Sequence, residues 1–393
     1  MNVERIRKDF PVLETGIIYF DSACMTLRPR PVIDAVMDYY MNTPVCSGRS
    51  THRLATELSI KVDDSREAIR RLINAPSDQN IVFTKNTTEA LNIAARGLPL
   101  VKGDKVLTLD REHNSNLAPW HVLRDEKGIV HDVIASNQDG TFNMENLKEA
   151  MTSSVKLLSL GHTSNIIGTS IPAKEIIEIA HDHGALVMLD SAQAVPHKKI
   201  DVQNMNVDIL AFSVHKMCGP TGVGVMYGKE EVLKKMRPLL AGGGAVAMTT
   251  LKDTSFLAPP DKFEAGLQNY AGLSATKAAV EYLESIGMEE VQEHDLSLNK
   301  LATQLLKDHV DILGPEDPSL RGGIFNFKTN VMDIHDMSLL LDSKGILTRA
   351  GMHCVHSWYD KIGGEGGTRA SFYIYNTQEE VRHFAETLLE ALE

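Results

Sequence analysis

The sequence is poor in cysteine, and its cysteines have none of the spacings in which cysteines act together. Its 393 residues include only Cys24, Cys46, Cys218 and Cys354, and no two of them form a C-x-x-C pair. A zinc ribbon and a disulfide framework both need closely or regularly spaced cysteines, so neither is indicated. Each cysteine must therefore be interpreted singly.

The sequence also lacks long apolar runs and an excess of positive charge. Nowhere do about 18 apolar residues follow one another, as a membrane-spanning helix requires. The first residues carry charges where a signal peptide has its apolar run, so we expect a cytoplasmic protein without membrane contact. The 40 Lys and Arg against 52 Asp and Glu give a net charge of −12. That charge argues against direct nucleic-acid binding, because phosphate recognition favours a basic surface.

What the chain does have is the composition of a globular protein, with 43% hydrophobic and 23% charged residues. Its length exceeds what one hydrophobic core usually organises, which favours two domains. Between Ile81 and Tyr227, short β-rich runs alternate with helical patterns, and this alternation predicts an α/β domain with a mostly parallel sheet. The predicted strands cover residues 81–83, 105–109, 155–160, 186–189, 209–213 and 223–227.

The pattern changes after Gly266 to longer helices and fewer strands. Helices are predicted over 274–286 and 291–307, and strands over 324–327 and 346–349. A capping box, Thr377-x-x-Glu380, opens a C-terminal helix whose apolar stripe must pack on another element. We therefore predict a large domain over 14–275 and a smaller α+β domain formed by 1–13 and 276–393. The stripe consists of Val381, Phe384, Leu388 and Leu392.

An acid and a lysine follow two successive predicted strands. Asp190 closes one apolar strand and Lys216 follows the next, so both side chains are expected at the ligand crevice of an open α/β sheet. A lysine beside a buried carboxylate can form a Schiff base with pyridoxal phosphate, while the carboxylate pairs with the protonated ring nitrogen. Taken singly, the two residues could also be a surface lysine and a helix-capping aspartate.

The motif around these residues resembles a known family. Ser213-x-His215-Lys216-x-x-Gly219-Pro-x-Gly222, together with Asp190-x-x-Gln193, is similar to the fold-type I pyridoxal-phosphate enzymes of the class V aminotransferase group. More narrowly, it resembles the Suf-type cysteine desulfurases. The likeness runs from Tyr19-Phe20-Asp21 to the segment that starts at Arg369. It implies an α/β large domain with a mostly parallel seven-stranded sheet and a smaller α+β domain.

The resemblance also implies roles for residues around the cofactor. Lys216 would hold pyridoxal phosphate, Asp190 would pair with its ring nitrogen, and Gln193 would hydrogen-bond its phenolic oxygen. His113 would stack on the ring and relay protons, and Asn165 would lie beside the cofactor oxygen and the substrate. Without the family match, His113 would be an exposed loop histidine and Asn165 a turn residue.

A phosphate site is predicted where a helix starts after the strand at 81–83. Thr87 and Thr88 offer hydroxyls and free backbone N–H groups at that helix N-terminus. An ordinary N-cap at Asn86, with Glu89 three positions on, could coexist with phosphate binding. By the same resemblance, Ser213 and His215 add phosphate contacts.

Cys354 matches the cysteine that distinguishes a desulfurase from its aminotransferase relatives, in the Suf-type pattern Arg349-x-Gly-x-His353-Cys354. A free thiol has a pKa of about 8.5, so a reactive one needs a cationic or hydrogen-bonding neighbourhood. His353, His356 or the substrate could provide it. The alternatives are a buried core cysteine, or a metal site built from His353, Cys354 and His356 with a fourth ligand that the sequence does not identify. We predict a nucleophile and no metal.

Two arginines are candidates for binding the substrate. Arg369 matches the family arginine that binds the substrate α-carboxylate, and a guanidinium suits that planar anion better than an ammonium does. Arg349 is a second candidate for the same neighbourhood. The alternative for Arg369 is a surface ion pair.

The chain departs from the family pattern at three places. Cys24 and Cys46 are additional cysteines near the expected mouth of the site, where they could relay sulfur, bind a metal or simply pack. We expect packing, because a free cysteine is often a small buried hydrophobe. Leu267 replaces a threonine that reaches the neighbouring subunit's phosphate. Cys218, beside the lysine, is expected to be structural.

The family likeness therefore predicts an enzyme that converts L-cysteine to L-alanine with a persulfide on Cys354. The sulfur would pass to an acceptor protein, a scaffold or carrier, for iron–sulfur cluster, thio-cofactor or tRNA synthesis, and the enzyme would be a homodimer. Alternatives on the same scaffold are an aminotransferase, a selenocysteine lyase and a cysteine-sulfinate desulfinase. A non-catalytic binding or sulfur-carrier protein is a further alternative, and the joint presence of Lys216, Asp190 and Arg369 argues against it.

Overall fold

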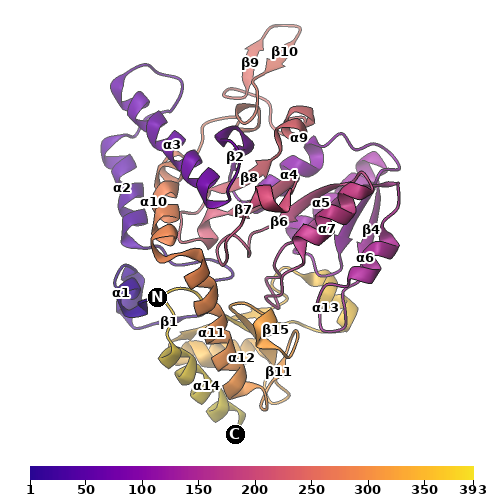
Figure 1. The fold of residues 1–393 in the computed structure, drawn as a ribbon. Helices are drawn as coiled ribbons and strands as arrows, with labels where there is room; N and C mark the ends of the chain where they lie inside the picture. Colours follow the sequence, from indigo (N-terminus) through magenta and orange to yellow (C-terminus); the bar gives the residue numbers. More distant parts are fainter.

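A seven-stranded sheet lies at the centre of the larger part of the molecule (Figure 1), as the computed structural model of residues 1–393 shows. Its strand order is β2-β8-β7-β6-β5-β3-β4, and only β8 runs antiparallel to its neighbours. The predicted fold class, a mostly parallel α/β sheet, is thereby confirmed. The strands are β2 (Ile81–Thr84), β3 (Lys105–Leu109), β4 (Val130–Ile134), β5 (Val155–Gly161), β6 (Leu186–Asp190), β7 (Ile209–Ser213) and β8 (Gly224–Gly228).

The sheet separates two apolar cores, because successive side chains of a strand point to opposite faces. In β7, Leu210 and Phe212 belong to the larger core, whereas Ile209 and Ala211 belong to the other. Helices α3 (Arg53–Leu72), α7 (Ala173–Asp182) and α10 (Tyr270–Ile286) contribute to the larger core, and α4 (Thr87–Gly97), α5 (Asn114–Lys127) and α9 (Glu230–Lys235) to the smaller. Two short helices, α6 (Met144–Ala150) and α8 (Val202–Met205), lie in connections.

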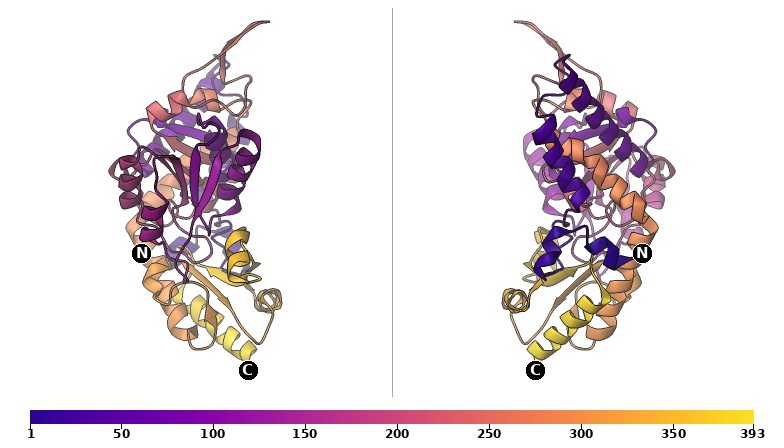
Figure 2. Two further views of the ribbon diagram at one scale, coloured as in Figure 1. Left: turned by 90° about the vertical axis from the view of Figure 1, so that its right-hand side faces the viewer. Right: turned by 90° about the vertical axis from the view of Figure 1, so that its left-hand side faces the viewer.

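Helix α10 joins the two parts of the molecule. It packs along α3 and α2 (Arg30–Asn42), and Figure 2 shows these helices side by side on one flank of the sheet. The domain boundary that the sequence predicts between residues 275 and 276 falls inside this continuous helix.

The smaller part is built on a four-stranded antiparallel sheet of order β11-β12-β15-β14. Its core includes Phe325, Phe372 and Phe384, all fully buried. The predicted capping box at Thr377 and Glu380 is present, and the stripe of the last helix packs in this core. The elements are β11 (Asp311–Ile312), β12 (Ile324–Lys328), β14 (Arg349–Gly351), β15 (Gly367–Ser371), α11 (Met288–Leu306), α12 (Ile334–Ser343), α13 (His356–Ile362) and α14 (Gln378–Leu392).

The single strand predicted over 346–349 is wrong, because the chain changes partners at Thr348. Residues Ile346–Leu347 form β13, which pairs in parallel with β1 (Ile18–Tyr19), whereas Arg349 starts β14 and pairs with β15. The apolar pattern shows that both pieces are extended. It does not show that they belong to different sheets.

The N-terminal segment lies against both parts of the molecule (Figure 2). Helix α1 (Val3–Arg7) and the turn after it place Ile6, Phe10 and Leu13 in the larger core, while Phe20 lies in the core of the smaller part. A hairpin of β9 (Val246–Thr249) and β10 (Thr254–Phe256) projects away from the body at the opposite end. None of the helices is both long and apolar enough to cross a membrane.

Candidate active site

A single cavity of about 250 Å³ opens at the carboxyl ends of the parallel strands, where ligands of open α/β sheets bind. All the residues that the sequence predicts for catalysis, cofactor and substrate line it. From the large sheet and its helices these are Thr87, Thr88, His113, Asn165, Asp190, Gln193, Ser213, His215 and Lys216, and from the smaller part they are Arg349, Cys354 and Arg369.

Lys216 and Asp190 are brought together by neighbouring strands. Asp190 is the last residue of β6, and Lys216 ends the short turn that follows β7, the next strand of the sheet. Burial lowers the pKa of Lys216, and the Asp190 carboxylate opposes that shift. The ammonium has no hydrogen-bond or ion-pair partner of its own, so Lys216 faces the cavity with a free amine. The Asp190 carboxylate accepts one hydrogen bond, from the Ala192 N–H at 3.0 Å.

The N-terminus of α4 forms one end of the cavity. Asn86 caps the helix by accepting from the Glu89 N–H at 2.9 Å, so the predicted N-cap is present. The Thr87 N–H donates to Ser213 Oγ at 2.8 Å, and the hydroxyls of these two residues lie 2.6 Å apart. A helix N-terminus with hydroxyls and backbone N–H groups is suited to a phosphate.

Glycine at position 224 allows this end of the cavity to form. A Cβ on Gly224 would come within 2.5 Å of the Asn86 backbone, so only glycine lets β8 approach the cap of α4 so closely. His215 also lines this end, and burial lowers its pKa to about 4, so its ring is uncharged near neutral pH.

His113 and Gln193 lie along the walls between the two ends. Burial and the Lys216 charge lower the pKa of His113 to about 3, and its Nδ1 accepts from the Ser115 N–H at 3.1 Å. An uncharged ring so fixed is suited to stacking. Gln193 donates from Nε2 to the Ala23 carbonyl at 2.6 Å, and its buried Oε1 has no partner. The residues present therefore fit pyridoxal phosphate, because they supply a free lysine, a carboxylate, an imidazole ring that can stack and a helix N-terminus suited to a phosphate.

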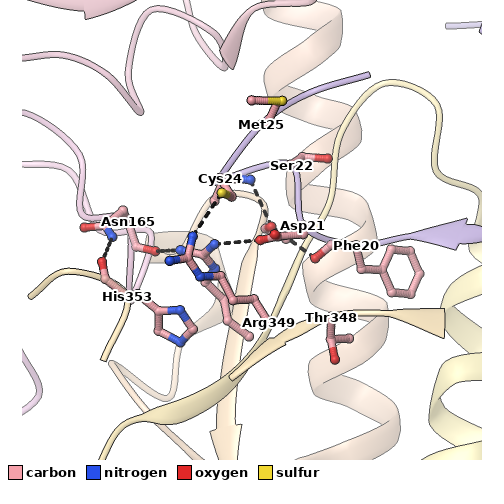
Figure 3. Close-up of polar contacts among 12 residues, drawn as sticks. Phe20, Asp21, Ser22, Cys24, Met25, Asn165, Thr348, Arg349 and His353 are labelled. Atoms are coloured by element: carbon pink, nitrogen blue, oxygen red, sulfur yellow. Dashed lines mark hydrogen bonds and ion pairs between the residues drawn. The ribbon is translucent and has the colours of Figure 1, made fainter. Parts of the chain in front are cut away.

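Arg369 connects the smaller part to the cavity. Its Nη1 donates to the Asn165 carbonyl and its Nη2 to the Asp21 carboxylate, both at 2.9 Å. Asn165 in turn donates to the His353 carbonyl at 2.8 Å (Figure 3). The guanidinium is fully buried, and its Nε has no partner. Because an unpaired buried donor is costly, this atom is available to an anionic ligand.

Cys354 follows His353 on a turn with an unusual backbone. The two residues have φ of 48° and 61°, in the left-handed region that side chains other than glycine rarely adopt. Such backbone strain is concentrated at functional sites. Burial and the Arg369 charge lower the pKa of His353 to about 2, so near neutral pH this ring can offer the thiol a hydrogen bond but no positive charge.

The other cysteines divide between the cavity and the core. Cys46 is half-buried against the larger core and Cys218 is fully buried, where burial raises its thiol pKa. Both are structural, as expected. The expectation that Cys24 packs is wrong, because Cys24 lines the cavity and its Sγ accepts a hydrogen bond from Arg349 Nη1 at 2.9 Å (Figure 3). None of the His, Cys, Asp and Glu side chains form a group that could hold a metal ion.

Arg111 and Glu112 also line the cavity, although neither was predicted from the sequence. Glu112 is fully buried, accepts from Asn116 Nδ2 and the Gly161 N–H at 2.8 Å, and has its pKa raised to about 7 by burial. The Nε and Nη2 atoms of Arg111 are buried without partners. Their position directly after β3, next to His113, is the sequence feature that could have identified them.

Comparison with known proteins agrees with this geometry. Residues 18–384 match the Aminotransferase class-V family. A cysteine desulfurase of Haloferax volcanii is 37% identical, with 99% of this chain and 96% of that protein aligned. The apo structure of a cysteine desulfurase from Thermococcus onnurineus superposes with a TM-score of 0.95 at 35% identity, over 98% and 97% of the two chains.

A second solved structure supports the same relationship. The cysteine desulfurase CsdA of Escherichia coli, in an S-sulfonic acid form, has a TM-score of 0.93 at 33% identity, over 100% of this chain and 98% of that one. The resemblance predicted from the Lys216 motif is confirmed at the family level, and the Suf-type branch stays a prediction. The chain belongs to the class-V aminotransferase family.

Proposed function

We propose that this chain is a pyridoxal-phosphate-dependent cysteine desulfurase, which converts L-cysteine to L-alanine and leaves the sulfur as a persulfide on Cys354. The observation that carries the proposal is that Cys354 and Lys216 line one cavity with Asp190 and Arg369. An aminotransferase uses the lysine, the aspartate and the arginine, but it needs no thiol beside them. Curated relatives that are 35% to 37% identical are named cysteine desulfurase or probable cysteine desulfurase, which supports the same function.

The cofactor would be held by residues that already face one another. Lys216 would bind it covalently, Asp190 would pair with the ring nitrogen, and His113 would stack on the ring. Gln193 and Asn165 would contact its oxygen, and the phosphate would bind among Thr87, Thr88, Ser213 and His215. When bound, pyridoxal phosphate supplies a conjugated ring that withdraws electrons from the substrate carbon beside the amine.

The residues of this chain would then move protons and orient the substrate. Arg369 would bind the carboxylate through its free Nε, with Arg349 beside it. The lowered pKa of Lys216 makes its neutral amine more available to take the Cα proton and return it. The uncharged ring of His113 would assist by holding the substrate and the cofactor in position.

Cys354 would carry out the step that defines a desulfurase. Its thiolate attacks the sulfur of the bound cysteine, so a sulfur–sulfur bond forms while the carbon–sulfur bond of the substrate breaks. The carbon keeps the electron pair of the broken bond and takes up a proton, and the product leaves as alanine. The sulfur remains on Cys354 as a persulfide and must pass to an acceptor.

We include in the proposal a homodimer in the cytoplasm and a sulfur-acceptor protein. The four free cysteines support the cytoplasmic setting. Leu267, at the position of the family threonine that crosses between subunits, is 68% exposed in the single chain.

The experiment is to incubate the purified protein with pyridoxal phosphate and L-cysteine, then measure alanine and map added sulfur by mass spectrometry. We expect alanine and extra sulfur on Cys354. Lys216→Ala should lose the visible absorbance of the lysine-bound cofactor and at least about a thousandfold of the activity. Cys354→Ala should keep the absorbance and lose the persulfide. A yellow protein that makes alanine only when a keto acid is added would indicate an aminotransferase instead.

A further inference from the structure

The active-site cavity contains two thiols, and the proposed reaction uses only one of them. Cys24 is half-buried in the turn after β1, where its N–H donates to the Asp21 carbonyl at 3.1 Å. Cys24 and Cys354 line the same cavity although 330 residues separate them in the sequence, the difference between 354 and 24. Figure 3 shows Cys24 beside Asp21, with its sulfur facing the Arg349 side chain.

A cation is aimed at the sulfur of Cys24. Arg349 Nη1 donates to Cys24 Sγ at 2.9 Å, so the guanidinium, which could have bound a carboxylate, is directed at a thiol. Reactive cysteines in proteins have this kind of electropositive and partly exposed surrounding, whereas inert ones are buried among apolar groups. Cys218, fully buried and with a raised pKa, is an inert example in the same chain.

Cationic side chains line the cavity that contains both thiols. Lys216, Arg349 and Arg369 lie in its walls together with Cys24 and Cys354. Arg369 is buried, lines the cavity and keeps an unpartnered Nε. A persulfide anion on Cys24 would lie beside the Arg349 guanidinium, and a hydrogen bond between charged partners is stronger than one between neutral groups.

We propose that Cys24 is a second sulfur carrier of this site, which takes the outer sulfur atom from the persulfide of Cys354. This inference rests on the proposed function, because it needs that persulfide. The Cys24 thiolate attacks the outer sulfur, a bond from that sulfur to Cys24 forms, and its bond to Cys354 breaks. Cys354 leaves as a thiolate and takes up the proton that Cys24 gave up. One persulfide replaces another, so no oxidant or reductant is consumed.

Without Cys24, Cys354 alone would both attack the substrate and store the sulfur. The transfer would separate these two tasks. Cys354, on its left-handed turn, would attack the substrate and be freed for a second molecule of cysteine. Cys24, held by Arg349 on a different element, would store the first sulfur until an acceptor removes it.

The test uses the holoenzyme with L-cysteine, without reductant and without an acceptor protein. The reaction is stopped by alkylation, and added sulfur is mapped on every cysteine over time. We expect sulfur first on Cys354 and then on Cys24, and an alanine burst about twice that of Cys24→Ser, which keeps a hydrogen-bond acceptor for Arg349. Cys46→Ser, which changes a thiol outside the cavity, is the matched control and should behave as the parent. Cys354→Ala should carry sulfur on neither cysteine.

The outcomes separate this inference from the proposed function. Alanine together with sulfur on Cys354 alone, even as a longer chain of sulfur atoms, overturns the relay and leaves the desulfurase intact. Sulfur on Cys24 in Cys354→Ala also overturns the relay, because Cys24 would then attack the substrate itself. Absence of alanine and of added sulfur in the parent would refute the proposed function.

A measurement on the protein without cofactor tests the part played by Arg349. Alkylation of Cys24 by iodoacetamide should slow several-fold in Arg349→Gln, while alkylation of Cys46 stays constant. Equal rates for Cys24 in the two proteins would overturn the role given to Arg349.

Discussion

At the scale of single residues, burial removes charge from the histidines of the cavity and leaves charge on stronger bases. The pKa values of His113, His215 and His353 are lowered to about 3, 4 and 2. Positive charge in the cavity therefore comes from the arginines and not from the histidines. Anionic groups of a cofactor or substrate would bind to the arginine side chains and to backbone N–H groups. We therefore expect their affinity to change little over the pH range in which a histidine free in solution takes up a proton.

The low pKa of His353 predicts how stability depends on pH. Between about pH 6.5 and 2 the unfolded chain binds a proton at this histidine and the folded chain does not, so the folded state loses stability as the pH falls. In His353→Gln this loss is absent. The stability of the variant relative to the parent should rise by at most about 1.4 kcal/mol per pH unit below pH 6.

Urea unfolding at several pH values between about 7 and 5 measures this difference. The corresponding His309→Gln, at an exposed position, is the control. A difference in stability between His353→Gln and the parent that stays constant with pH would show that His353 is protonated in the folded protein.

The residues of the cavity could be predicted individually, but their contacts could not. Asp190, Lys216 and Thr87 could be located from the apolar pattern, because they lie at a strand end, after a strand and at a helix start. Cys354 and Arg369, in a turn and in the middle of β15, were identified through the family resemblance. The contact of Cys24 with Arg349 and the ion pair of Asp21 with Arg369 join residues 325 and 348 positions apart. No local pattern contains that information, and the expectation that Cys24 packs was wrong for this reason.

At the scale of elements, predictions succeeded where burial makes the pattern strong. Strands β3 and β7 have the predicted bounds because they lie inside the sheet and are almost wholly buried. Strand β4 was missed because it is an edge strand whose residues are mostly exposed, and the projecting β9–β10 hairpin was missed for the same reason. An exposed strand has no apolar alternation to detect.

The capping box of α14 gives a prediction at this scale. Thr377 Oγ1 accepts from the Glu380 N–H at 3.1 Å, and Glu380 Oε2 accepts from the Thr377 N–H at 3.1 Å. Thr377→Ala should lower the free energy of unfolding by about 1 kcal/mol, because one helix N–H loses its partner. Thr377→Ser keeps the hydroxyl and should remain near the parent in thermal and urea unfolding. Equal losses in both variants would mean that the threonine methyl group, and not the cap, stabilises the helix.

At the scale of the whole molecule, the two parts meet closely at Gly168. This glycine follows β5 with φ of 70°, and a Cβ there would overlap the carbonyl oxygen of Arg321, which precedes β12. Gly168→Ala should therefore push the two parts of the active site apart and lower the free energy of unfolding by roughly 2–5 kcal/mol.

Gly184→Ala is the matched control for that substitution. Gly184 has φ of 73°, and no atom lies within 4 Å of the position of its Cβ. It should therefore show only the backbone cost, about 1–2 kcal/mol. Calorimetry of both variants separates the two contributions, and equal losses would show that the contact with Arg321 contributes nothing.

The N-terminal segment has a consequence for how the protein is made. Arg7 pairs with Glu380 across 373 positions, and β1 completes a ladder with β13. During translation these first residues leave the ribosome long before their partners exist. The large sheet can form while synthesis continues, but the segment that carries Asp21 and Cys24 cannot be fixed until nearly the whole chain has emerged. A ribosome stalled before β15 would therefore hold a sheet with an unfinished active site.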